Sequence, residues 1–520
     1  MAELHDVRRR KTDETRLDHP EVPAAHTNSP AWLAQRALLA VGLMVGFYLL
    51  AVTIALALLW VPYAEVTYIG RIHLKLTALC VIAGLTILWS LVPRIDRFTP
   101  PGPRLDEAAH PRLFDVIRRV ATATGQSAPA EVYLLNEVNA WVTHRGGVMG
   151  FGSRRVMGIG LPLVQAVTVA EFEAIIAHEF GHYCAGDVTL GPWIHKTRAA
   201  IGRTIAGVGQ TIVAAPFLWY GGHFLRLTHA ISRQQEFIAD RTAAGVAGAA
   251  AMSSALKRVS TAGPLFSAYL DQEVGPVLNA GYLPPVSAGF KEFLGSHRIG
   301  AISAQLLARA EAAEETDPFD THPCLRDRLA ALQSAPAITP AAESTEPAAS
   351  ALLGNPDAHT RALLEAVAGA DAVRKLKPIE WDAVGPTVYT TRWRELAQRH
   401  AAWLSRFTTD TLPAGTEAFI HAGSGLVRAE EQNVNGDERA ARAAQVIGVA
   451  LGVLLIDDGW RVHTRPGLPL TFERESRTFD PFATVDALLN GRITGDGWRA
   501  ECEALGLGSR PLNRTPQPAL

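Results

Sequence analysis

Residues 178–182 read His-Glu-Phe-Gly-His (HEFGH), an HExxH pattern in a chain of 520 residues. The residues before it favour a helix, because a Thr-x-x-Glu capping box at 168–171 is followed by apolar residues at helical spacing. On that helix His178 and His182 are four residues apart, so both imidazoles leave the same face. Two nitrogen ligands can then bind one Zn²⁺ ion, and Glu179 beside them can take a proton from water that the metal activates.

A catalytic zinc ion needs a third protein ligand, and a second motif offers one. Residues 232–241 read SRQQEFIADR, in which Glu236 and Asp240 are again four residues apart and share a helix face. Glu236 can supply the third ligand, and Asp240 can accept the other ring N–H of a ligating histidine and so fix its tautomer. Taken alone, Glu236 is more simply a solvated helix carboxylate, but the HExxH pattern favours the ligand. We therefore predict one zinc ion per subunit.

These motifs resemble the M48 family of membrane metallopeptidases, which includes the heat-shock protease HtpX and the CAAX-processing proteases. Asn139-Ala140-Trp141 is similar to the Asn-Ala-aromatic strand before the catalytic helix of that family, and Thr321-His322-Pro323 is similar to its Thr-His-Pro ending. The resemblance covers about residues 30–335. It implies a zinc endopeptidase with the ligands given above.

The resemblance also implies an edge strand that binds extended substrate by adding a strand to the sheet. The candidates are Asn139, Ala140 and Trp141, or Arg155–Ile159 (RVMGI). Glycines between these two stretches indicate a hairpin or flap, with an ordinary loop as the alternative; they are Gly146, Gly147, Gly150 and Gly152. His322 is a candidate transition-state stabiliser, and a capping or packing role is equally open.

Two uncharged apolar runs precede the motifs, and we predict transmembrane helices at about 37–60 and 73–93. The tail at 1–30 is polar and basic, which predicts disorder. Six Lys and Arg residues lie in the first 36 residues, against two in the loop between the runs. The N-terminus and everything after the second run are therefore predicted to be cytoplasmic, in a bacterial-type inner membrane.

A third apolar segment at 204–225 separates the two halves of the predicted zinc site. One full crossing there would put Glu236 on the opposite side of the membrane from His178 and His182, so a single span is excluded. Two crossings need about 40 apolar residues. We therefore predict a helix or broken hairpin that dips into or lies on the membrane, or equally a buried packing segment.

The fold class predicted for the whole chain is mainly α (α+β). A membrane-anchored, zincin-like peptidase domain at 94–333 follows the two membrane helices, and a Pro/Ala/Ser/Thr-rich linker at 334–356 leads to a separate α+β domain at 357–520. The apolar run Val446–Ile456 is too short to span a membrane and predicts a core helix. The C-terminal domain is a candidate for adaptor or regulatory contacts.

The composition excludes several classes of function. A net charge of −2 gives no field to attract nucleic acid, and four cysteines without a CxxC pair exclude a disulfide scaffold and a cysteine zinc site. A cofactor-binding reductase would need a Gly-rich fingerprint after a strand, and the sequence has none.

The predicted function is an integral-membrane zinc endopeptidase that cleaves membrane or unfolded proteins at a cytoplasm-facing site, in protein quality control. The alternatives are a CAAX-type processing peptidase, although two spans could not enclose an intramembrane chamber, and a non-catalytic scaffold that acts through the C-terminal domain.

Overall fold

The computed structural model describes residues 30–92, 98–145, 153–184, 187–209, 211–312, 322–333, 347–427 and 434–513. Most of the predicted tail, the glycines at 146–152, Thr321 and the first part of the predicted linker lie outside these residues. The chain divides into two compact units. The first unit comprises 1–93, 186–237 and 315–335, and the second comprises 94–185, 238–314 and 336–520.

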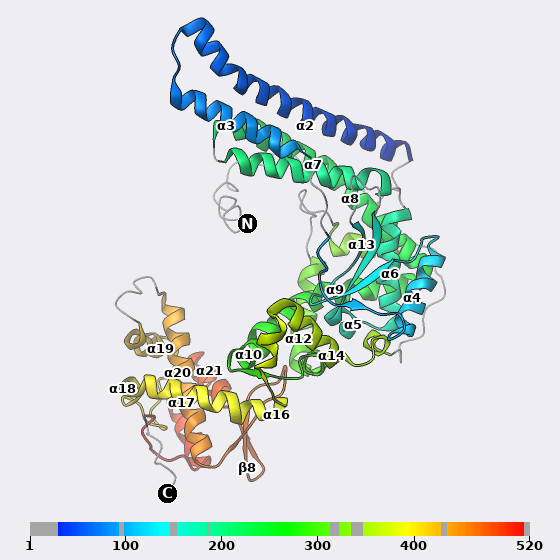
Figure 1. Cartoon of the computed structure of the whole chain (residues 1–520). Coiled ribbons are helices and arrows are strands. Elements are labelled where there is room, and N and C mark those ends of the chain that lie inside the picture. The colour runs from blue at the N-terminus through cyan, green and yellow to red at the C-terminus, as the bar shows by residue number, and fades with distance from the viewer. Residues whose placement is uncertain are drawn as a thin grey trace. The chain divides into compact units, whose positions relative to one another are not determined.

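Long apolar helices lie where the two membrane spans were predicted. They are α2 (Pro30–Ala64), which continues into the π-helical turn η1 (Glu65–Ile69), and α3 (Leu74–Leu91). Both are long and apolar enough to cross a membrane. Much of their apolar surface is exposed, as at Leu49 and Ile82, which is what a helix facing lipid requires. Figure 1 shows the two helices side by side.

The apolar segment 204–225 forms the tip of a broken helical hairpin, one of the predicted alternatives. The hairpin consists of α7 (Asp187–Val208), the short 3-10 turn η2 (Ile212–Ala214) and α8 (Ala215–Ala247). It packs along α2 and α3 (Figure 1), with Phe217 and Phe224 buried in the same core as Phe47. The relation of this hairpin to the membrane stays a prediction.

The second unit contains a four-stranded mixed sheet in the order β1-β2-β4-β3. Its strands are β1 (Arg104–Leu105), β2 (Glu131–Leu135), β3 (Ala140–Arg145) and β4 (Arg154–Gly160). β4 pairs in parallel with β2 and antiparallel with β3. The helices α4 (Pro111–Ala123) and α6 (Val169–Cys184) contact each other, and α6 also contacts β3; α5 (Leu161–Ala166) connects β4 to α6.

The strand order corrects one prediction. Arg155–Ile159 lies in β4, between two neighbours, so this stretch cannot be the edge that receives a substrate strand. Among the described strands, β3 has β4 as its one partner and so forms one of the two edges of the sheet, with β1 at the other. This strand starts at Ala140, directly after Asn139, so the other candidate stretch has the required position.

Helices follow the sheet in the second unit, namely α9 (Ala249–Tyr269), η3 (Leu270–Val274), α10 (Gly275–Asn279), α11 (Val286–Gly295) and α12 (His297–Ala312), with β5 at Tyr282–Leu283. α13 (Leu325–Gln333) belongs to the first unit.

The C-terminal region is mostly helical around α20 (Gly436–Asp457), which is a buried core helix as predicted from 446–456. Its apolar composition alone would also suit a membrane span. The other elements are η4 (Ala349–Leu352), α14 (Pro356–Ala368), α15 (Ala370–Arg374), β6 (Lys377–Pro378), α16 (Trp381–Val384), η5 (Gly385–Tyr389), α17 (Thr390–Arg399), α18 (Ala401–Leu404), α19 (Thr416–Gly423), η6 (Ser424–Leu426), β7 (Arg461–His463), β8 (Thr471–Arg474), β9 (Arg477–Phe479), α21 (Pro481–Leu489) and α22 (Gly495–Ala504).

Part of this region shares a core with the peptidase helices. Trp381, Val384 and Val388 pack in one apolar cluster with residues of the 265–299 segment, and β6 pairs in parallel with β5. A separate domain at 357–520 stays a prediction. The packing nevertheless joins its first helices to α9 and α11.

Candidate metal centre

The helix that carries the HEFGH motif is fixed at its start by the predicted capping box. The backbone N–H of Thr168 donates to Glu171 Oε2 at 2.7 Å, and the N–H of Glu171 donates back to Thr168 Oγ1 at 3.3 Å. Glu171 is buried, and its other carboxylate oxygen accepts hydrogen bonds from Ser254 and from Arg258 Nε, the latter at 2.8 Å. One carboxylate therefore caps α6 and ties it to α9.

The three motif residues gather their polar atoms in one place. One ligand atom from each of His178, Glu179 and His182 lies within 4.8 Å of the others. The two imidazole rings are 4.9 Å apart and almost perpendicular. A zinc ion with ligands at about 2.0–2.1 Å could draw such a group together by small side-chain rotations. His178 is buried, whereas Glu179 and His182 are half-buried, so the group is open on one side.

Asp240 orients the first histidine. His178 Nδ1 lies 2.9 Å from Asp240 Oδ1, and Asp240 is only 1% exposed. A carboxylate at this distance favours the tautomer that carries its proton on Nδ1, and this tautomer leaves the Nε2 lone pair of His178 available for a metal. Gly181 allows this contact, because a Cβ there would lie 2.8 Å from the Cα of Ala239. The small residue in HEFGH thus lets α6 and the end of α8 meet backbone to backbone.

Glu236 lies one turn before Asp240 on α8, so the two carboxylates share a face of one helix. Its side chain is buried and has two basic residues beside it. His322 Nε2 is 3.4 Å from one carboxylate oxygen, and Arg328 Nη2 is 3.4 Å from the other. Sequence reasoning missed Arg328, although its position in the LRDRLAAL stretch after His322 was a signal. His322 is therefore beside the candidate ligand, and its own role stays open.

The substrate-binding candidates lie at the edge strand. Asn139 pairs through its backbone carbonyl with the N–H of Gly160 at 2.8 Å, Ala140 begins β3, and the Trp141 ring covers Gly158. The end of the motif helix is attached to this strand as well. Tyr183, which directly follows HEFGH, donates its hydroxyl proton to the carbonyl of Val142 at 2.8 Å.

The Tyr183 ring is held in turn by the Arg155 guanidinium, whose Cζ lies 4.6 Å from the ring centroid. Sequence reasoning did not identify Tyr183. The residue therefore connects the helix of the metal-binding motif to the edge strand of the sheet.

An HExxH helix with a carboxylate-oriented histidine, packed against the edge strand of a mixed sheet, defines a metallopeptidase-type site. The comparisons with known proteins agree with that class. The model of peptidase family M48 matches residues 107–335, which contain both motifs. This part of the chain is therefore a peptidase domain of family M48.

Curated relatives in several bacteria share the same region. The protease HtpX homolog of Thiobacillus denitrificans is 27% identical over 242 residues, which cover 43% of this chain and 71% of that protein. The protease HtpX of Hahella chejuensis is 24% identical over 46% of this chain and 89% of its own length, and that of Serratia proteamaculans is 28% identical over 36% and 68%. No solved structure matches the chain significantly. The family match, these relatives and the apolar helices together identify a membrane metalloprotease.

Proposed function

We propose that this protein is an integral-membrane zinc endopeptidase that cleaves membrane or unfolded proteins in protein quality control. The observation that carries the proposal is the cluster of His178, Glu179 and His182 with Asp240 behind it. Nitrogen ligands from two histidines, with a carboxylate on the far ring nitrogen, are the set that zinc sites use. Glu236 would complete the three protein ligands.

The proposed chemistry assigns one task to each side chain. Bound zinc would polarise the scissile carbonyl and lower the pKa of a nearby water. Glu179 takes the proton of the attacking water and then passes it to the leaving amine. Asp240 keeps His178 in the tautomer that presents Nε2. His322, beside Glu236, is the candidate for stabilising negative charge in the transition state.

The substrate would bind along β3 as an added strand. The edge position of this strand supports the proposal, because it offers main-chain groups on the side away from β4. Asn139, Ala140 and Trp141 at its start would meet the residues next to the scissile bond. Such main-chain recognition requires an extended chain, which favours unfolded segments over folded proteins.

We further propose that the membrane hairpin keeps the peptidase close to the lipid surface. Tyr220 Oη donates to the Leu43 carbonyl at 2.7 Å, and Arg203 Nη2 donates to the Ser90 carbonyl at 3.0 Å. Leu43 lies in the N-terminal half of α2, and Ser90 lies next to the last residue of α3. The tip beyond them therefore extends only part of the way along α2 and α3.

Large apolar side chains are exposed at the tip. Ile212 is 90% exposed and Trp219 66%, which suits a hairpin that dips into the bilayer from one side. The excess of Lys and Arg before the first span supports a cytoplasmic location for that side. The proposed partners are protein substrates and the lipid bilayer, with no role for nucleic acid; residues 357–520 would serve adaptor or regulatory contacts.

The peptidase proposal is tested with detergent-purified, zinc-loaded protein and an unfolded membrane-protein substrate. Glu179→Gln should keep the metal and abolish cleavage, because it removes the base and leaves the ligands. Glu173→Gln is the matched control on the same helix, since Glu173 pairs with Arg119 instead. Equal cleavage by wild type and Glu179→Gln would refute the mechanism. Stoichiometric zinc without any cleavage would favour a scaffold.

The orientation is tested by labelling single cysteines with a membrane-impermeant maleimide, after the four native cysteines have been replaced by serine. Arg71→Cys should react in intact cells, whereas Arg326→Cys should react only after permeabilisation. Ile212→Cys should remain unlabelled in both conditions because the hairpin tip lies in lipid. Labelling of position 326 in intact cells would contradict the cytoplasmic site, and labelling of position 212 would contradict the dipping hairpin.

A further inference from the structure

A cavity of about 200 Å³ lies within the second unit, away from the HEFGH motif. Three segments form it: the end of the peptidase helices, the α16–η5 segment and the loop that connects β7 to β8. Its lining residues are Gln272, Glu273, Arg298, Trp381, Val384, Tyr389, Thr464, Arg465, Leu468, Pro469 and Leu470. The cavity is therefore a place where one ligand could touch both the peptidase helices and the C-terminal region.

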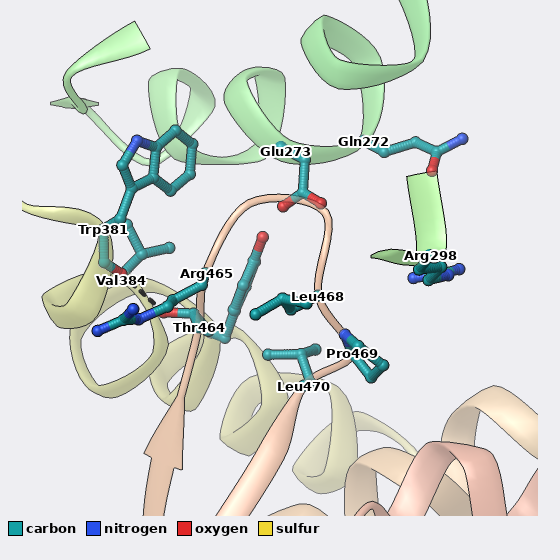
Figure 2. A pocket seen from close by; sticks show the side chains of 11 residues that line it. Gln272, Glu273, Arg298, Trp381, Val384, Thr464, Arg465, Leu468, Pro469 and Leu470 are labelled. Carbon is teal, nitrogen blue, oxygen red and sulfur yellow. Dashed lines mark hydrogen bonds between the residues drawn. The ribbon is translucent and has the colours of Figure 1, made fainter. Parts of the chain in front are cut away.

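A half-buried carboxylate faces this cavity. Figure 2 shows the Glu273 side chain directed at the space enclosed by the β7–β8 loop. Its hydrogen bond is a weak one, from the N–H of Gly467 at 3.3 Å. Among the described residues, no cation is in ion-pair contact with it, and burial raises its pKa. A carboxylate that is partly shielded from water and has one weak, neutral hydrogen-bond partner is a natural site for a cationic ligand.

A guanidinium lies at the same cavity without touching that carboxylate. Arg298 interacts with Glu273 electrostatically, yet no hydrogen bond or ion pair joins the two side chains within the described structure. Arg465 is on the other side of Glu273 in Figure 2, and its guanidinium is 3.6 Å from Asp382. Glu273 and Arg298 thus present opposite charges across one small space.

The remaining walls are aromatic and aliphatic. The Trp381 ring is fixed by a hydrogen bond from its Nε1 to the Pro285 carbonyl at 3.2 Å, and Leu468 and Leu470 line the cavity from the loop. Tyr389 adds a hydroxyl, and burial with the nearby charge of Glu273 raises its pKa to about 12. The hydroxyl is therefore a hydrogen-bond donor throughout the physiological range.

We propose that this cavity binds a free α-amino acid with an apolar side chain, its ammonium group on Glu273 and its carboxylate toward Arg298. A ligand with both charges satisfies two groups that do not satisfy each other. The volume suits a molecule of this size, and the apolar walls suit its side chain. Glu273 lies among the peptidase helices, whereas the β7–β8 loop belongs to the C-terminal region. A ligand that contacts both therefore also stabilises the position of the loop against these helices.

Calorimetry on the full-length protein in detergent tests the proposal, with L-leucine, L-isoleucine, L-valine and L-methionine as probes at millimolar concentrations. Isoamylamine and isocaproate are the matched probes, because each is leucine without one of its two charged groups. We expect at least one of the amino acids to bind, and to bind at least tenfold more tightly than the corresponding amine or acid. The same ligand should slow hydrogen exchange in residues 464–470.

Glu273→Gln and Arg298→Gln should each weaken that binding at least tenfold. Glu292→Gln, on the exposed surface of α11, should leave it unchanged. Melting temperatures of the free variants show whether they fold. The proposal is overturned if none of the four amino acids binds, if folded Glu273→Gln binds them as wild type does, or if isoamylamine binds as tightly as leucine. None of these outcomes depends on zinc or on peptidase activity.

Discussion

Asp240 Oδ1 lies 2.9 Å from His178 Nδ1, and this contact joins the HEFGH motif to the second motif, 62 residues further along the chain. Asp240→Asn keeps a hydrogen-bond acceptor but removes the charge that favours the imidazole as a ligand. Loss of such a partner lowers metal affinity by about 10- to 100-fold. Competition with a chelator measures the affinity, and Asp271→Asn on the exposed part of η3 is the control. Unchanged zinc affinity in Asp240→Asn would show that the contact only packs two helices together.

The sequence predicted features that lie within one helix better than features that depend on how distant segments pair. The capping box at Thr168, the face shared by His178 and His182, and the apolar helices all follow from periodicity, and the structure has them. The choice between two edge strands does not, because the order of strands in a mixed sheet depends on long-range pairing. The candidate Arg155–Ile159 was wrong for that reason, because it lies between two neighbouring strands.

Contacts between distant segments could not be predicted from the sequence either. Arg328 beside Glu236 and Tyr183 beside Val142 bring together residues 92 and 41 positions apart. The shared core of Trp381 with the 265–299 helices likewise has no local signal in the sequence. Spacing predicted the candidate ligands and Asp240, whereas the contacts of Arg328 and Tyr183 depend on the fold.

Tyr183→Phe should weaken substrate binding while leaving zinc affinity unchanged. The ring stays against Arg155, but the hydrogen bond to the Val142 carbonyl is lost, and the edge strand β3 is no longer fixed to α6. A single hydrogen bond contributes about 0.5–1.5 kcal/mol, so KM should rise roughly 2- to 12-fold with a smaller change in kcat. Steady-state cleavage of an unfolded substrate separates these values. A fall in kcat alone would place the tyrosine in the chemical step rather than in strand positioning.

Glu171→Ala should destabilise the peptidase domain far more than Glu173→Ala, two residues away. Glu171 caps α6 and binds Arg258 from a buried position, so its loss should cost about 1–3 kcal/mol. Glu173 pairs with the exposed Arg119, and such surface pairs contribute about 0–1 kcal/mol. Thermal melting of both variants in detergent checks the difference. Equal melting temperatures would mean that the capping box adds nothing to the stability of the catalytic helix.

His110→Gln should make the stability of the second unit less sensitive to acid. Burial lowers the pKa of His110 below its ordinary value of 6.5, and the nearby His359, whose ring centroid is 4.9 Å away, lowers it further. Asp106 and the Leu353 carbonyl act in the opposite direction but do not outweigh these effects. Between the lowered pKa and 6.5 the unfolded chain binds more protons than the folded one, so wild-type stability falls as the pH drops through this window.

The His110→Gln variant lacks that proton uptake, so its melting temperature should fall less than that of the wild type when the pH is lowered from neutral to mildly acidic values. His297→Gln, on the exposed face of α12, serves as the control and should follow the wild type. The histidines of the metal site are the same in all three proteins, so their contribution cancels in the comparison. If His110→Gln loses as much stability in acid as the wild type, the pair of His110 and His359 is not the acid-sensitive element of this unit.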